Sequence, residues 1–192
     1  MNVFKIITIA VASAFISGCA FVPQEANIDP NISMMPSSEG HGVTVSVKVL
    51  DERPSKSLGH RGTAYGKAAE ITSAQDVAVV VHEKIVYGLQ AKGFDISDFT
   101  PESPIKLQVE LRLLEYSTST GFWTGGVHVK GAIKVVADKN GSIYEKMYRT
   151  EDEERVVVVP DASSNEKMIN EGLAALLMQI FEDNALFAHL AK

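Results

Sequence analysis

Three segments in the second half of the chain alternate apolar and polar residues, and no other feature limits the possible folds as strongly. Residues 105–113 place Ile, Leu or Val at every second position and Lys, Gln, Glu or Arg between them. Residues 127–135 continue this pattern, and Asn140-Gly141 provides a type I′ turn into the third segment, residues 143–159. A period of two is typical of strands with one buried face. We therefore expect three consecutive strands that form an antiparallel meander.

One further strand and two amphipathic helices surround this meander. Residues 43–49 alternate Val with Thr, Ser and Lys, which predicts a half-buried strand. A capping box at Ser73 and Asp76 opens the first helix, which stops at Gly93. A second box at Ser163 opens a helix with an apolar face over residues 169–180. The order strand, helix, three strands, helix predicts an α+β fold with a mainly antiparallel sheet and two helices packed on one face.

The N-terminus has the organisation of a bacterial lipoprotein signal. Lys5 supplies the positive charge, residues 6–16 supply the apolar region, and two small residues stand directly before Cys19. The apolar region is shorter than the roughly 20 residues that a membrane-spanning helix needs. We therefore expect residues 1–18 to be a removable signal peptide. An ordinary secretory peptide with an accidental cysteine and a buried helix are the alternatives.

Cys19 is the expected attachment point for lipid. In bacterial lipoproteins this cysteine carries a diacylglyceryl thioether and an N-acyl chain, and each buried methylene adds about 0.8 kcal/mol to membrane affinity. These covalent groups are the only cofactor that we expect. An Asp directly after the cysteine is the usual inner-membrane retention signal, and this chain has Ala20 there. The expected location is the outer membrane, with the protein facing the periplasm.

The rest of the chain divides into a tether and one domain. Residues 19–42 contain three prolines among Asn, Ser and Gly without sustained periodicity, so we expect a flexible tether. Residues 43–192 are long enough for a single periplasmic domain. Because Cys19 is the only cysteine, an acylated chain forms no disulfide. Removal of Lys5 with the signal peptide changes the net charge from −6 to −7. This acidic balance argues against nucleic acid as a partner.

The sequence contains no catalytic signature. Asp51, Arg53 and His60 place an acid, a cation and a base in neighbouring loops. An Asp-x-Arg at a strand end more often makes a local ion pair, so we favour a structural role. The five histidines are scattered and lack the close spacing of zinc ligands. We therefore expect neither an enzyme nor a metal protein.

The candidate partner-binding residues are Phe122 and Trp123, which lie between two of the long strands in the glycine-rich stretch 120–126. Aromatic residues at a loop tip are common anchors for partner proteins or for membrane interfaces. The alternative is that Trp123 folds back into the core, because tryptophan is usually largely buried. The acidic run 151–154 is a second candidate, although such runs more often protect a strand edge.

Several of these features together resemble the YajG family of uncharacterised bacterial lipoproteins. They are the signal ending in Cys19, a strand ending in Asp51-x-Arg53, a long helix ending at Gly93, the meander and a C-terminal helix. The resemblance extends from the N-terminus to about Leu190. The resemblance implies a fold and a location in the cell, but no site residue apart from the acylated cysteine.

Two functions are consistent with these observations. The first is a membrane-anchored, non-catalytic interaction or adaptor module that binds an envelope protein. The alternative is an auxiliary component of an envelope transport or assembly system that binds a lipid or another amphiphile between sheet and helices. The many β-branched residues favour the first, because they indicate close packing. An enzyme of envelope polymer turnover would require a cleft that contains Asp51, Arg53 and His60 together.

Overall fold

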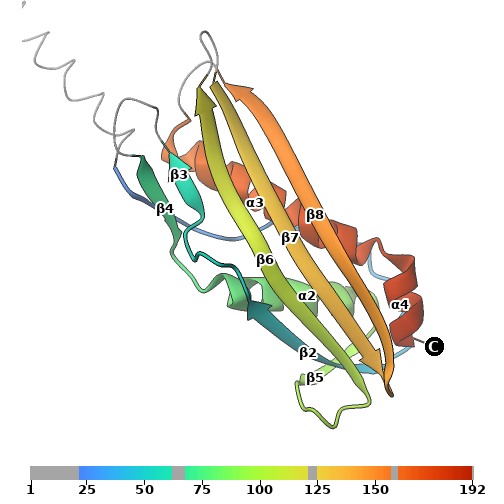
Figure 1. Cartoon of the computed structure of the whole chain (residues 1–192). Helices are drawn as coiled ribbons and strands as arrows, with labels where there is room; N and C mark the ends of the chain where they lie inside the picture. Colours follow the sequence, from blue (N-terminus) through green and yellow to red (C-terminus); the bar gives the residue numbers. More distant parts are fainter. Residues whose placement is uncertain (1–21, 62–67, 121–124, 157–159, 192) are drawn as a thin grey trace, which may run out of the picture.

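The computed structural model describes residues 22–61, 68–120, 125–156 and 160–191. These residues form eight strands and three helices (Figure 1). The strands are β1 (Gln24–Ala26), β2 (Thr44–Asp51), β3 (Gly59–Arg61), β4 (Ala69–Ser73), β5 (Asp95–Asp98), β6 (Ile105–Thr120), β7 (Gly125–Lys139) and β8 (Ser142–Val156). The helices are α2 (Val77–Ala91), α3 (Ala162–Phe181) and α4 (Asn184–Ala191).

All eight strands belong to one mixed sheet. The meander β6-β7-β8 is antiparallel along its whole length, as the alternating pattern predicts. The other edge of β6 pairs with two separate groups of strands. Near its start β6 pairs with β2, which is parallel to it and also pairs with β5. Near its end β6 pairs at Tyr116 with β3, which leads through β4 to β1.

The fold class predicted from the sequence is therefore wrong. The sheet is mixed and not mainly antiparallel, the described residues contain three helices and not two, and the strand order does not follow the predicted one. The parallel pairings β1–β4, β2–β5 and β2–β6 join segments that are distant in sequence. A local apolar pattern indicates that a strand forms but does not indicate which strand pairs with it.

The three helices cover one face of the sheet (Figure 1). α2 packs on β2 and β5, α3 packs on β6, β7 and β8, and α4 packs on β7. Two glycines allow very close approach. A Cβ atom on Gly172 would lie 2.6 Å from Cγ1 of Val129, and one on Gly88 would lie 2.2 Å from the ring of Phe181. The interface between α3 and β7 and the contact between α2 and α3 are therefore filled at these positions.

The local signals for turns and helix ends are largely confirmed. Asn140 and Gly141 both have positive φ, at 51° and 87°, which fits the predicted turn. Helix α2 ends at Ala91, shortly before Gly93 with φ 83°. The helix N-caps differ from the predicted serines, because the carboxylates of Asp76 and Asp161 accept the first free backbone N–H groups.

The segment predicted as a flexible tether is packed on the domain over its described part. Residues 24–26 form β1, and the side chains of Ile28 and Ile32 are buried in the hydrophobic core. Ser37 and Gly40 donate backbone hydrogen bonds to the C-terminal end of α2. Buried and exposed residues alternate from Gln24 to Ile32. Ala26, Ile28 and Ile32 follow this period of two, so the sequence contains a short periodic signal for their burial that the prolines obscure.

Candidate functional site

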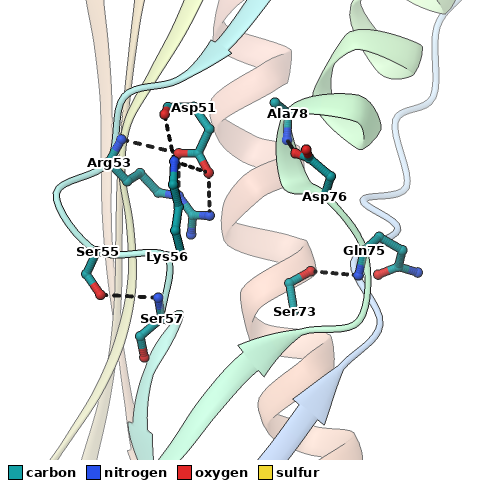
Figure 2. A network of polar contacts seen from close by, with 9 residues as sticks. All are labelled: Asp51, Arg53, Ser55, Lys56, Ser57, Ser73, Gln75, Asp76 and Ala78. Carbon is teal, nitrogen blue, oxygen red and sulfur yellow. Dashed lines mark hydrogen bonds and ion pairs between the residues drawn. The ribbon is translucent and has the colours of Figure 1, made fainter.

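The candidate site forms where β2 leaves the sheet, at Asp51. The next residues turn back, and Arg53 makes a two-pronged ion pair with this carboxylate (Figure 2). Its Nε donates to Oδ1 and its Nη2 donates to Oδ2, both over 2.8 Å. Lys56 Nζ lies 3.0 Å from the same Oδ2 and donates to the backbone carbonyl of Asp51 over 2.7 Å. One carboxylate therefore holds two cations.

The two cations differ greatly in exposure. The side chain of Arg53 is 3% exposed, whereas that of Lys56 is 66% exposed. Burial alone would raise the pKa of Asp51, but hydrogen bonds from Arg53 and Lys56 outweigh it and lower the pKa to about 2. Asp51 is therefore charged at neutral pH, and its charge compensates the buried guanidinium.

One nitrogen of the guanidinium has no partner. Among the described residues, Nη1 of Arg53 is buried and makes no hydrogen bond. An unsatisfied buried donor is uncommon because it loses its hydrogen bonds to water. Because Nη1 is out of reach of solvent, Asp51 alone compensates the guanidinium, and the interior bears the cost of the unpaired N–H groups.

A cleft of about 600 Å³ opens beside this ion pair, and we call it the Arg53 cleft. Figure 2 shows Asp51, Arg53 and Lys56 on one side and the turn from Ser73 to Asp76 on the other. The lining includes Val49, Leu50, Asp51, Arg53, Lys56, Ser57, Glu70, Thr72, Ser73, Gln75, Asp76, Val77 and Ala78. Apolar, hydroxyl and charged groups are thus mixed along its walls.

The cleft also borders an open edge of β2. β5 pairs with β2 only as far as Val47, so among the described residues no strand covers β2 residues 48–51 on that side. Asp95 N donates to Val43 O, whereas Glu52 N donates to Leu111 O on β6. Because alternate residues point to opposite edges, the backbone groups of Val49 and the N–H of Asp51 face the open edge, whereas the carbonyl of Asp51 already accepts from Lys56. An extended polypeptide could pair there.

His60 does not join Asp51 and Arg53 in one site. It lines a second cleft, of about 320 Å³, together with Arg53, Pro54 and Leu114. Arg53 lies between the two clefts, with Asp51 lining the first and His60 lining the second. The arrangement that would have favoured an enzyme is therefore not formed by these two clefts.

Three predicted site residues, Cys19, Phe122 and Trp123, lie outside the described residues, so their predicted roles stay predictions. The acidic run 151–154 is exposed on β8, which pairs only with β7 among the described strands. Within the described ranges, no group of three or more His, Cys, Asp or Glu residues is arranged to hold a metal ion. None of the helices described is both long and apolar enough to cross a membrane.

The sequence did not indicate a second polar cluster, centred on Asp183. Its Oδ2 accepts hydrogen bonds from Tyr144, Lys146 and Tyr148, and its Oδ1 caps α4 through the backbone N–H of Leu186. Burial raises the pKa of Asp183, but these hydrogen bonds bring it well below its ordinary value. Tyr144, Lys146 and Tyr148 occupy every second position of β8, and this spacing could have indicated that they share one polar partner. The cluster joins α4 to β8 and is structural.

Comparison with known families identifies the chain at the level of family. The profile of a family described as uncharacterised lipoproteins, Lipoprotein_16, matches residues 30–191. The chain belongs to this family. The match confirms the predicted YajG-like resemblance and makes the chain a lipoprotein, a class of membrane-anchored bacterial proteins. No curated protein matches the chain at a significant level.

Two solved structures show the same general fold. Protein XCC0632 from Xanthomonas campestris is 12% identical, with a TM-score of 0.57 over 85% of this chain and 96% of that one. A structure described as an uncharacterised protein is also 12% identical, with a TM-score of 0.51 over 83% and 98% of the two chains. At this identity the similarity concerns the fold and not the activity.

Proposed function

We propose that this lipoprotein is a non-catalytic interaction module of the bacterial envelope. Cys19 anchors it to the periplasmic side of the outer membrane, and the domain binds an extended segment of a partner protein at the Arg53 cleft. The observation that carries this proposal is the Arg53 cleft beside the open edge of β2. Addition of a strand to an exposed sheet edge is a common mode of peptide recognition.

The chemistry of the cleft indicates what kind of segment fits. Val49 offers backbone groups at the open edge, and the exposed ammonium group of Lys56 lines the same cleft. Among the charged lining residues, Asp51, Glu70 and Asp76 are acidic, while Arg53 and Lys56 are basic. One carboxylate therefore remains in excess. A segment that carries a Lys or Arg is favoured over an acidic one.

Close packing disfavours the alternative, a carrier of lipid or another amphiphile. A carrier would need an apolar cavity between the helices and the sheet. In that space Gly172 of α3 lies directly against Val129 of β7, and Gly131 of β7 lies against Leu176 of α3. An acyl chain could enter at these positions only by separating α3 from the sheet.

Position-specific crosslinking in living cells tests the proposal. A photocrosslinking amino acid, p-benzoylphenylalanine, replaces Thr72, which is exposed and lines the Arg53 cleft. The matched control places it at Ser142, which is exposed at the start of β8. We expect one discrete crosslinked protein from position 72 and none from position 142. No product from position 72, or the same products from both positions, would contradict the proposal.

A further inference from the structure

The N-terminal segment is fixed to the domain from Gln24 onward. Gln24 is 8% exposed, and its Nε2 donates to the carbonyl of Ala162 at the start of α3 over 2.6 Å. Its Oε1 accepts from Arg61 over 3.1 Å and from Asn165 over 3.0 Å. The strand β1 that begins here also pairs with β4. These contacts from three elements leave Gln24 little freedom to move away from the domain.

The chain between the lipid anchor and this fixed point is short. Gln24 is five positions after Cys19, and an extended chain spans at most about 3.6 Å per residue, so the reach is about 18 Å. A strand as long as β7, with 15 residues, measures about 50 Å. The anchor therefore holds one end of the sheet near the membrane. The distance between the membrane surface and the domain is shorter than it would be if residues 19–42 formed a free tether.

The position of Gln24 in the sheet indicates which end this is. Gln24 pairs with Ile71, Ile71 with Gly59, and Gly59 with Tyr116, so these residues form a row across the sheet. Tyr116 is four residues, or about 13 Å, before the end of β6. Figure 1 shows β3 and β4 at the end of the molecule where β6 ends and β7 begins, opposite the turn between β7 and β8.

We propose that the end of the sheet at Ser119 and Gly126 lies against the phospholipid surface that holds the acyl chains of Cys19, and that the turn at Asn140 points away from it. This orientation rests on the lipid anchor of the proposed function. Residues 151–154 place exposed carboxylates in the same half of β8, so attraction to anionic headgroups is not its cause. The short connection between Cys19 and Gln24 imposes this orientation.

This orientation also presents the Arg53 cleft to the periplasm. Asp51 pairs with Leu111, which precedes the end of β6 by nine residues. At about 3.3 Å per residue, the Asp51 wall of the cleft lies roughly 30 Å from the membrane-facing end of the sheet, and the opposite wall at Thr72 lies closer, near the row of Ile71 about 13 Å from that end. A partner protein reaches it without entering the headgroup region.

Two single-cysteine variants of the full lipoprotein test the orientation. Because Cys19 is the only cysteine and is acylated, Ser119→Cys and Ser142→Cys each introduce one free thiol. Both serines are exposed, and they lie at opposite ends of the meander. Each variant receives a fluorophore and is reconstituted in phosphatidylethanolamine vesicles whose headgroups carry a nitroxide quencher. We expect quenching at position 119 and little at position 142.

A lengthened connection provides the second arm of the experiment. Insertion of 20 Gly and Ser residues after Val22 adds about 25 Å of flexible reach. It should reduce the quenching at position 119 while the protein stays on the vesicles. Equal quenching at positions 119 and 142, or quenching at 119 that the insertion leaves unchanged, would overturn the orientation. Protein that fails to float with the vesicles would instead overturn the lipid anchor, and the orientation with it.

Discussion

Asp51 binds one buried and one exposed cation, and this difference should separate their contributions to stability. Asp51→Ala leaves the guanidinium of Arg53 buried without its counterion, which should lower the free energy of unfolding by about 3 kcal/mol. Lys56→Ala removes an exposed ion pair from the same carboxylate and should cost less than about 1 kcal/mol. Urea denaturation of both variants measures the two values. Equal losses would contradict this account of the site.

Two carboxylates with lowered pKa values should make the fold sensitive to acid. The pKa of Asp51 falls to about 2 and that of Asp183 falls well below its ordinary value. The unfolded chain, in which Asp has a pKa of about 4, therefore takes up these protons more readily. The stabilisation is complete above about pH 4 and is lost as the pH falls toward 2.

The variant Asp183→Asn identifies the contribution of the second carboxylate to this acid sensitivity. We expect its free energy of unfolding to fall less steeply between pH 4 and pH 2.5 than that of the unaltered protein, as measured by urea titrations at each pH. Glu182→Gln changes an exposed neighbour and should keep the original pH dependence. If the free energy of unfolding falls equally steeply with pH in the unaltered protein and in Asp183→Asn, Asp183 does not contribute to the acid sensitivity.

The same residues show what local sequence can predict about a site. The Asp51-x-Arg53 spacing predicts an ion pair, and the structure confirms it, because both partners lie on one short turn. The opposite wall of the cleft, at Thr72 and Gln75, could not be predicted. It reaches β2 through the pairing of β3 with β6, which is a contact between distant parts of the chain.

At the scale of secondary-structure elements, α3 packs closely on β7. Gly172→Ala would place a Cβ atom 2.6 Å from Val129, in a wall of buried β-branched side chains. Such overpacking costs about 1–3 kcal/mol, more than the gain of up to about 1 kcal/mol for replacing a helical glycine. We expect a net loss of about 1–2 kcal/mol by chemical denaturation. As a control, Glu171→Ala changes an exposed neighbour and should alter the free energy of unfolding by less than about 0.5 kcal/mol. If Gly172→Ala has the stability of the unaltered protein, the interface between α3 and β7 is loose.

The N-terminal segment should stabilise the domain. A chain that begins at residue 43 lacks β1 and the buried side chains of Ile28 and Ile32, each of which contributes roughly 1.5–3 kcal/mol by its burial. Compared with a chain that begins at residue 22, it should lose at least about 3 kcal/mol in urea denaturation. Equal stability of the two chains would support a free tether over these residues.

Strand length explains which elements were predictable. β6, β7 and β8 have 15 or 16 residues each, so their period of two is clear, and the Asn140 turn fixes the register between β7 and β8. β1 and β3 have three residues each, which is too short to show a period. β2 was predicted to be half-buried, but Ser46 on its polar face is also buried, because its hydroxyl is hydrogen-bonded to Asp98 and Thr100 at and after the end of β5.

At the scale of the whole molecule, the anchor, the sheet and the cleft form one arrangement. In the proposed orientation, the lipid at Cys19 holds the end of the sheet near Gln24, and the sheet extends the Arg53 cleft into the periplasm. The proposed function uses the surface of the protein, and the packed interior supports that surface. A carrier would require the reverse, an interior that opens to hold a ligand.

Native mass spectrometry of residues 22–192, produced in the periplasm and purified without detergent, distinguishes these two possibilities most directly. If the protein acts through its surface, the measured mass is that of the polypeptide alone. A discrete additional mass that extracts into organic solvent would contradict this account and would show that the domain carries an amphiphile.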